Sequence, residues 1–299
     1  MRAELVVDAR CELGEGPVWD PGARCLWWTD IDGRAIWRFD PLSEGTERFT
    51  PPDRVGFIAV ATGGRLLLGG AKALYMAVPG LGGALAATKL VDVEADLATT
   101  RANDGRADRV GNVVFGTLDE QKPRQTIASF YQYSSAHGLR RLDDLPHCAV
   151  SNSLAFSPDG RALYFTDTPT GVIRCGDYDA DSARVTNIRA FATLGPGEGH
   201  PDGAIVDADG CLWSSAWGGA VVRRFTPDGR VDRVLEIPTK NPTCPAFGGA
   251  QLATIFVTSS RQQHTAEELS GAPQAGGVFA LRMPGIAGIA DTAFIQRSS

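Results

Sequence analysis

The sequence predicts an all-β protein, a six-bladed β-propeller with four-stranded blades. One short pattern occurs six times along the chain: an apolar run, a turn that contains glycine, and a second apolar or aromatic run. Repeats of 40–50 residues are typical of propeller blades. Six such units account for the 299 residues, so we expect a single domain over residues 1–299.

One glycine in each turn marks the repeat. The six markers are separated by 42, 47, 49, 50 and 39 residues, and they are Gly22, Gly64, Gly111, Gly160, Gly210 and Gly249. In the fourth copy, AFSPDGRALYFTD, an Asp-Gly pair stands where a tight turn needs a positive φ. The glycine therefore predicts a hairpin at this point of each unit.

Most units continue with a second pair of strand candidates. Examples are residues 33–41, 171–180 and 220–229, which end in Asp-Pro, Asp or Pro-Asp-Gly. Four strands per unit complete one blade.

We expect the ring to close through its two ends. Residues 4–11 and 277–283 are both strand-like, and pairing them in one blade removes an exposed sheet edge. Two segments interrupt the pattern: 262–277 is polar, with one possible helical turn, and 120–138 is predicted to be a loop at the mouth of the channel.

Composition argues against several classes of function. The net charge is −6 and no run of Lys or Arg exceeds two residues, so we expect no nucleic-acid partner. The chain lacks 18 consecutive apolar residues and its first residues do not resemble a signal peptide, so we expect no membrane association and a cytoplasmic location. The six cysteines are dispersed along the chain and are interpreted as free thiols. We expect the protein to be a monomer or a weak homo-oligomer.

Four oxygen-bearing side chains stand at nearly the same offset from the glycine markers. Asn103, Asn152 and Asp202 precede their marker by eight residues, and Glu15 precedes its marker by seven. Taken singly, Asn or Asp before glycine is an ordinary turn residue. The repeated offset instead favours convergence near the axis, and oxygens from Glu15, Asn152 and Asp202 suit a hard divalent cation with open coordination positions.

Several segments together resemble the gluconolactonase, regucalcin and senescence marker protein family. They cover most of the chain in order: LGEGPVW, RANDG, SNSLAFSPDGRALYFTDT and HPDGAIVDADGCLW. The later segments GGAQLATIFVTS and AGGVFAL look most like the bacterial sugar-lactonase branch. The resemblance implies a six-bladed propeller with one divalent metal ion in its channel, namely Ca, Zn, Mn, Mg or Fe(II).

The resemblance also implies roles for individual residues. Glu15, Asn152 and Asp202 would be the metal ligands, and Arg101 and Asn103 would contact the substrate. The family often has an acidic residue after the Gly-Thr step. Asp119 and Glu120 both fit that position; we include Glu120 in the substrate-contact set and leave the choice open.

Two positions depart from the family pattern. Ser153 stands where the family usually has glycine after the ligand Asn, so the local backbone is expected to differ. Val113 and Val114 replace a bulkier pair. Outside the motifs, we expect Trp217 in the core, with a channel-lining position as the alternative. We expect His200 to be structural or exposed, with a place at the rim of the pocket as the alternative.

The resemblance implies hydrolysis of a sugar-acid lactone to the free aldonate, and the chemistry of the site residues fits that reaction. The substrate would be a small aldonolactone, such as a glucono-, xylono-, arabinono- or galactonolactone, and Asp202 would take the proton from the attacking water. Two alternatives remain open. One is another metal-dependent esterase or phosphotriesterase on the same scaffold, and the other is a calcium-binding or regulatory propeller without catalysis.

Overall fold

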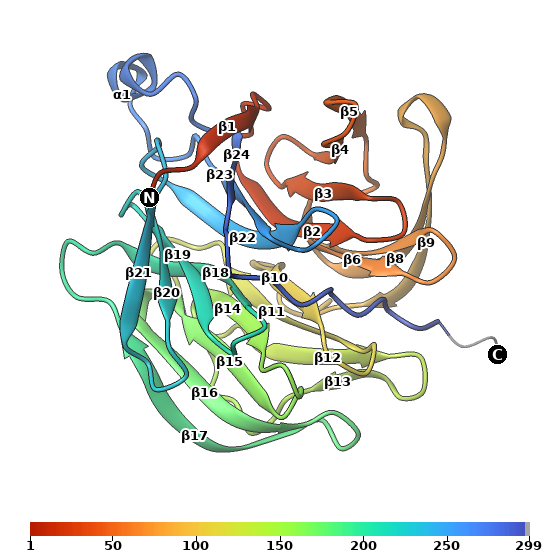
Figure 1. Cartoon of the computed structure of the whole chain (residues 1–299). Coiled ribbons are helices and arrows are strands. Elements are labelled where there is room, and N and C mark those ends of the chain that lie inside the picture. Colours follow the sequence, from red (N-terminus) through yellow and green to blue (C-terminus); the bar gives the residue numbers. More distant parts are fainter. Residues whose placement is uncertain (297–299) are drawn as a thin grey trace.

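Each of the six sequence units forms most of a four-stranded antiparallel sheet in a computed structural model that describes residues 1–296 (Figure 1). The first blade contains β2 (Gly14–Asp20), β3 (Cys25–Asp30), β4 (Ala35–Asp40) and β5 (Gly45–Phe49). The second contains β6 (Val55–Ala61), β7 (Arg65–Gly70), β8 (Ala73–Pro79) and β9 (Leu85–Asp92). The third contains β10 (Thr100–Ala107), β11 (Val113–Asp119), β12 (Phe130–Ser134) and β13 (Gly138–Arg141).

The remaining three blades follow the same order, and the predicted six-bladed propeller is confirmed. The fourth contains β14 (Ser151–Phe156), β15 (Ala162–Asp167), β16 (Val172–Asp179) and β17 (Arg184–Thr193). The fifth contains β18 (His200–Val206), β19 (Leu212–Trp217), β20 (Val221–Phe225) and β21 (Val231–Glu236). The sixth contains β22 (Pro242–Gly248), β23 (Thr254–Ser259), β24 (Val278–Arg282) and β1 (Glu4–Val7).

The two ends of the chain close the ring as expected. β1 pairs antiparallel with β24, placing Leu5 opposite Phe279 and Val7 opposite Val278. We call this β1–β24 pairing the seam. The residues before β1 also contact the fifth blade, because Ala3 N donates a hydrogen bond to Glu236 O at 3.0 Å. β1 and β24, the first and last strands of the described residues, thus share one sheet.

Apolar packing between neighbouring blades forms the core. A separate cluster of buried apolar side chains lies at each of the six blade interfaces. Aromatic pairs cross several of them: Trp19 stacks on Phe256 with ring centroids 6.0 Å apart, and Trp213 meets Phe247 edge-on at 5.9 Å. Both faces of every sheet are therefore covered.

A segment after β24 crosses the face at the first turns of the blades (Figure 1). Gly288 N donates to Leu252 O in the sixth blade, and Phe294 N donates to Val60 O in the second. Between these anchors, Asp291 forms a 3.0 Å ion pair with Arg106 near the channel axis, and both side chains are buried. We call residues 283–296 the C-terminal strap.

Some local expectations need correction. The segment 120–138 is not a loop throughout, because Phe130–Ser134 forms β12, whose alternate side chains are buried. In the first blade Arg24, not Gly22, adopts the positive φ, at 53°. The helical turn expected in the polar segment is present as α1 (Ala266–Gly271). Within residues 1–296, no helix has the length and apolar character to cross a membrane.

Ring closure generates a stability prediction. Removing residues 1–10 deletes β1 and exposes the edge of β24, so the melting temperature should fall by roughly 10 °C, as expected for a loss of several kcal/mol in a domain of this size. Differential scanning calorimetry measures this. Val6→Ser serves as a control, because that side chain is exposed on the same strand. A deletion variant that melts with the control would refute the role of the seam.

Candidate functional site

The six innermost strands all break their pairing register close to the same level. These strands are β2, β6, β10, β14, β18 and β22, and each contacts the first strand of the next blade around the axis. Such bulges kink a strand and redirect its side chains. Glu15 and Asn152 are the last paired residues before their bulge, whereas Asn103 and Asp202 are the first bulged residues. Asn103, Asn152 and Asp202 therefore share one glycine offset, but Asn152 differs from the other two by one position in strand pairing.

A cavity of about 320 Å³ lies at this end of the channel. Five of the six sequence-predicted site residues line it: Glu15, Arg101, Asn103, Asn152 and Asp202. They come from four blades and are separated by up to 187 positions in the sequence (202 minus 15). The sixth, Glu120, is not among the lining residues.

Two carboxylates, those of Glu15 and Asp202, line the cavity without an ion-pair partner among the described residues. Burial raises the pKa of Asp202, and the charges of Glu15 and Asp104 raise it further. Burial also raises the pKa of Glu15, and Asp104 again adds to the effect. Within residues 1–296 neither Glu15 nor Asp202 takes part in a salt bridge. Deprotonated, this pair needs a cation from outside the chain.

The donor set fits a divalent cation. Two carboxylates and the Asn152 amide present hard oxygen atoms to one cavity, which is the ligand type that Ca²⁺, Mg²⁺ and Mn²⁺ prefer. The described part of the chain holds no cluster of three His, Cys, Asp or Glu side chains suited to a metal ion. Any protein site here therefore depends on the amide oxygen as its third ligand.

Hydrogen bonds fix the two amides across three blades. Arg101 Nη1 donates to Asn103 Oδ1 at 2.9 Å, and Asn103 Nδ2 donates to Asn152 Oδ1 at 3.2 Å. Asn152 Nδ2 then donates to Thr168 Oγ1 at 2.9 Å, which donates to Pro201 O at 3.0 Å. The chain of bonds determines which atom of each amide is the acceptor.

Ser153, which stands where the family usually has glycine, adopts a left-handed backbone conformation. Its φ is 57°, close to the 53° of Gly16, which follows Glu15 in the first blade. The left-handed region costs a non-glycine residue on the order of 1–3 kcal/mol. Ser153 Oγ donates to Asp202 O at 2.6 Å and so offsets part of that cost. The expectation of a backbone that differs from the family's stays a prediction.

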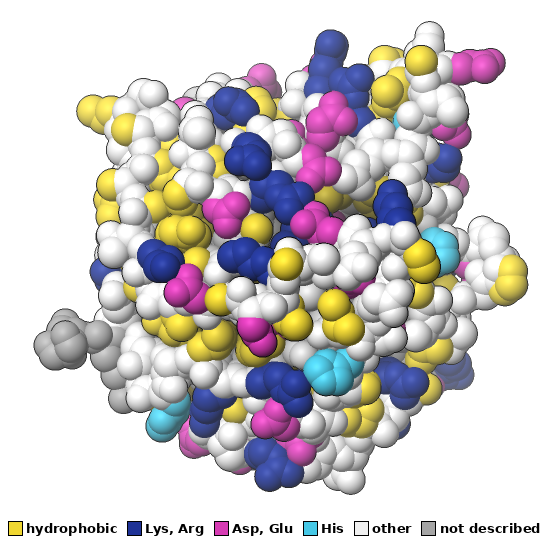
Figure 2. Space-filling view, turned by 180° about the vertical axis from the view of Figure 1, so that it is seen from behind, with side chains coloured by type: hydrophobic (Ala, Val, Ile, Leu, Met, Phe, Trp, Pro, Cys, Tyr) yellow, Lys and Arg dark blue, Asp and Glu magenta, His cyan; other side chains and the backbone are white. Residues whose placement is uncertain are grey.

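Both acidic candidates after the Gly-Thr step lie beside the cavity. Asp119 is fully buried and accepts hydrogen bonds from Gln121 N and Gln125 N, so it organises its own loop. The Glu120 carboxylate lies 3.4 Å from Arg101 Nε. Viewed from behind Figure 1, Lys and Arg side chains stand next to Asp and Glu side chains near the centre of the face (Figure 2).

Three of the polar lining residues escaped sequence reasoning, namely Arg124, Thr168 and Gln262. His200 and Trp217 also line the cavity, in agreement with the alternative expectation for each; His200 is exposed and Trp217 is only partly buried. The expectation of a core Trp217 is therefore wrong. These residues belong to strand ends and connecting loops, which differ between blades. Only the Gly-Gly pair after Trp217 signals a turn at the mouth.

The chain is similar to known proteins over almost its whole length. It is 40% identical to an L-arabinolactonase from Azospirillum brasilense, with 93% of this chain and 91% of that protein covered. It is 35% identical to a 6-deoxy-6-sulfogluconolactonase from Pseudomonas putida, with coverages of 95% and 96%. Among solved structures, a calcium-binding protein, regucalcin, from Agrobacterium tumefaciens matches with a TM-score of 0.89 and 28% identity, over 98% of this chain and 97% of that chain.

The sequence pattern of one family covers most of the chain. The SMP-30/gluconolactonase/LRE-like region matches residues 13–261, which include all five predicted lining residues and the first five blades. The resemblance inferred from the sequence motifs is thereby confirmed: this chain belongs to the SMP-30/gluconolactonase/LRE-like family.

Proposed function

We propose that this chain is a metal-dependent lactonase that hydrolyses an aldonolactone to the free aldonate. One observation carries the proposal: oxygen donors for a cation and hydrogen-bond donors for a polar substrate line the same cavity. The activity is that of the relatives with 35–40% identity, which are named as sugar lactonases.

The cavity suits a small substrate rich in hydroxyl groups. Its volume of about 320 Å³ is at the lower end of the range for small-molecule pockets. Arg101 and Gln262 can donate hydrogen bonds to sugar oxygens, and Thr168 adds a hydroxyl. Trp217 provides an apolar surface against which a sugar ring can pack.

Glu15, Asn152 and Asp202 would hold the divalent cation. A cation bound there supplies Lewis-acid polarisation of the lactone carbonyl. The identity of the ion is left to experiment, because the same oxygens accept Ca²⁺, Mn²⁺ or Mg²⁺, and the prediction also includes Zn²⁺ and Fe²⁺.

The protein's own groups account for orientation and proton transfer. An Asp202 carboxylate oxygen takes a proton from the attacking water, whose oxygen bonds to the lactone carbonyl carbon. The ring C–O bond breaks, and Asp202 returns its proton to the ring oxygen, which becomes a hydroxyl; the new carboxyl group then loses its own proton to solvent to give the aldonate. Arg101 orients the lactone, since it lines the same cavity. Asn103 Nδ2 donates to Ser151 O at 2.8 Å and to Asn152 Oδ1 at 3.2 Å, so Asn103 acts by holding Arg101 Nη1 through its Oδ1.

A calcium-binding function without catalysis is the second candidate, favoured by the regucalcin match. Calcium binding requires the acidic side chains of Glu15 and Asp202 but does not require Arg101, which lines the same cavity. Screening lactones against metal ions after chelation separates the two functions, because a binding protein would take up calcium without releasing acid from any lactone.

Asp202→Asn should remove most of the activity. The substitution keeps the side-chain volume but deletes a negative charge and the proposed base, so turnover should fall roughly 10²–10⁴-fold and cation affinity should fall with it. A pH-stat assay and isothermal titration calorimetry measure the two effects. Asp228→Asn, at an exposed turn of the same blade, is the matched control. Wild-type activity in Asp202→Asn would disprove the assignment.

Arg101→Ala should separate substrate binding from cation binding. Losing a charged hydrogen-bond donor should reduce kcat/KM by roughly 10–100-fold, since such bonds contribute about 1.5–3 kcal/mol. Cation affinity measured by calorimetry should remain that of the wild type. Loss of cation binding together with unfolding would contradict the assigned role.

Asp104 should make the stability of chelator-treated protein depend on pH. Burial raises the pKa of Asp104 to about 6, despite a hydrogen bond from Leu154 N and the charge of Arg106. The folded state therefore binds this proton more tightly, and the resulting stability is lost as the pH rises from about 4 through 6. Relative to Asp104→Asn, the unfolding free energy of the wild type should fall by on the order of 2–3 kcal/mol between pH 4 and 7. Urea titrations at each pH test this; a difference that stays constant or rises would be inconsistent with it.

A further inference from the structure

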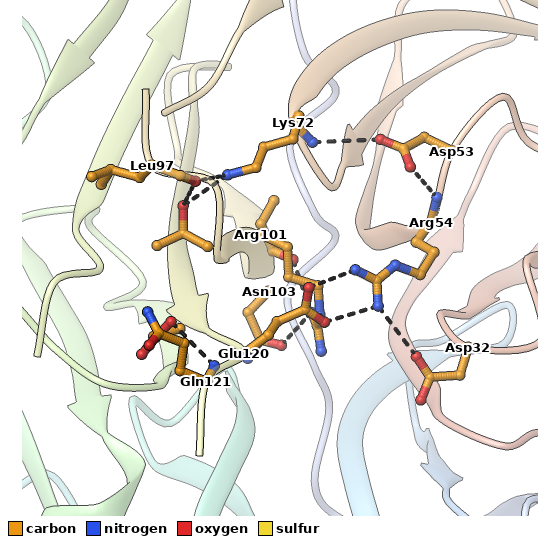
Figure 3. Close-up of polar contacts among 12 residues, drawn as sticks. Asp32, Asp53, Arg54, Lys72, Leu97, Arg101, Asn103, Glu120 and Gln121 are labelled. Atoms are coloured by element: carbon orange, nitrogen blue, oxygen red, sulfur yellow. Dashed lines mark hydrogen bonds and ion pairs between the residues drawn. The ribbon is translucent and has the colours of Figure 1, made fainter. Parts of the chain in front are cut away.

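A chain of polar side chains crosses the mouth of the cavity (Figure 3). Arg54 lies between β5 and β6, and its two terminal nitrogens donate to both Glu120 oxygens at 2.8 and 2.7 Å. On one side, Glu120 Oε1 lies 3.4 Å from Arg101 Nε. On the other, Arg54 Nη1 lies 3.9 Å from Asp32 Oδ1, and Asp32 accepts a hydrogen bond from Gln262 Nε2. We call these five residues the rim chain.

Only the two ends of the rim chain line the cavity, namely Arg101 and Gln262. We propose that Arg54 is a positioning residue for lactone turnover: it holds Glu120 beside Arg101 and Asp32 beside Gln262, so that both cavity-lining side chains keep a fixed orientation. This inference rests on the lactonase function proposed above. Arg54 itself does not line the cavity.

Arg54 affects substrate binding because it keeps one hydrogen-bond donor of Arg101 available. Arg101 Nη1 is committed to Ala102 O and Asn103 Oδ1, each at 2.9 Å, and Nε faces Glu120. Within the described residues neither Nε nor Nη2 has a protein hydrogen-bond partner. Nε is buried beside Glu120, so Nη2 is the donor left for a substrate. Without Arg54, the Glu120 carboxylate can bind Arg101 in bidentate fashion through Nε and Nη2 and remove that donor.

Charge alternation points to Arg54 as the central member. Along the rim chain the charged groups run Arg101, Glu120, Arg54 and Asp32, so each carboxylate has a cation beside it. Without Arg54, the rim chain holds two carboxylates, Asp32 and Glu120, and one guanidinium, that of Arg101. Glu120 then has Arg101 as its remaining ion-pair partner among residues 1–296.

The backbone of Arg54 is fixed independently of its side chain. Arg54 N donates to Asp53 Oδ1 at 2.7 Å, and Asp53 Oδ2 accepts from Lys72 N at 3.4 Å (Figure 3). A substitution at Arg54 should therefore leave the local fold in place. The Arg54 and Glu120 side chains are 26% and 38% exposed, and ion pairs at that exposure add little stability. Their effect should appear in kinetics rather than in folding.

Steady-state kinetics of Arg54→Ala test the proposal. With the best lactone for the wild type, KM should rise about tenfold while kcat changes by less than about threefold, because the loss is in substrate binding. Millimolar guanidinium should restore KM, and methylammonium should not, since only guanidinium reproduces the two-pronged contact. Adding Glu120→Gln to Arg54→Ala should lower KM again, because the amide cannot withdraw Arg101 as an ion-pair partner.

Arg184→Ala is the matched control. Arg184 makes an equivalent bidentate pair with Asp144, at 2.6 and 2.8 Å, on an outer strand away from the cavity. If Arg54→Ala has the KM of Arg184→Ala and guanidinium has no effect, the positioning role is overturned.

A second measurement does not depend on lactonase activity. Glu120 leads into an exposed segment that contains Arg124, and Arg54 ties that segment to the first two blades. Trypsin should therefore cut after Arg124 faster in Arg54→Ala than in Arg184→Ala. If the wild type hydrolyses no lactone, the proposed function fails, but this comparison still decides whether Arg54 holds Glu120: equal cleavage rates overturn the inference and faster cleavage supports it.

Discussion

Apolar packing between the blades of a closed ring determines where polar and functional side chains can lie in this protein. Each sheet lies between two others, and one buried cluster occupies each interface, as the Trp19–Phe256 and Trp213–Phe247 pairs illustrate. Neither face of a blade can therefore carry many charged groups without burying them unpaired. Functional polar side chains are left with the axis and the loops at its mouth.

The axis itself is divided by charge. At the cavity end stand the carboxylates of Glu15 and Asp202, with Asp104 further along the channel, and at the other end Arg106 is paired with Asp291 of the C-terminal strap. Burying a carboxylate without an ion-pair partner is costly, and burial is the main reason that the pKa values of all three are raised. The strap neutralises Arg106 at the closed end, so the open end retains the negative charge that a cation can satisfy.

Regular features of the chain were predictable and irregular ones were not. The glycine markers predict six first turns because every blade must reverse its innermost strand, and apolar alternation predicts the strands beside them. Glu15, Asn103, Asn152 and Asp202 were found because they recur at one level of that repeat. Asp104 was missed, since a bulge lets two consecutive residues lie inside and an alternating pattern allows only one.

The loops follow no such repeat. Arg54 and Asp32 lie on connections of different lengths, where partners from other blades set the direction of the side chains. No local sequence pattern around Arg54 predicts a contact with Glu120, which is 66 residues away. Family resemblance supplied Glu120 but not the arginine that holds it.

The seam between β1 and β24 has a consequence for how the molecule is made. During synthesis, residues 4–7 leave the ribosome more than 270 residues before their partners at 278–282 (278 minus 7). At about 5–20 residues per second, β1 and the open edge of the growing array wait on the order of 10–60 seconds before they can meet. Until then every nascent chain carries an unpaired strand and an uncovered sheet edge, both able to pair with a neighbouring polypeptide. Yield in a crowded cell should therefore depend on elongation speed and chaperone supply at least as much as on the stability of the finished ring.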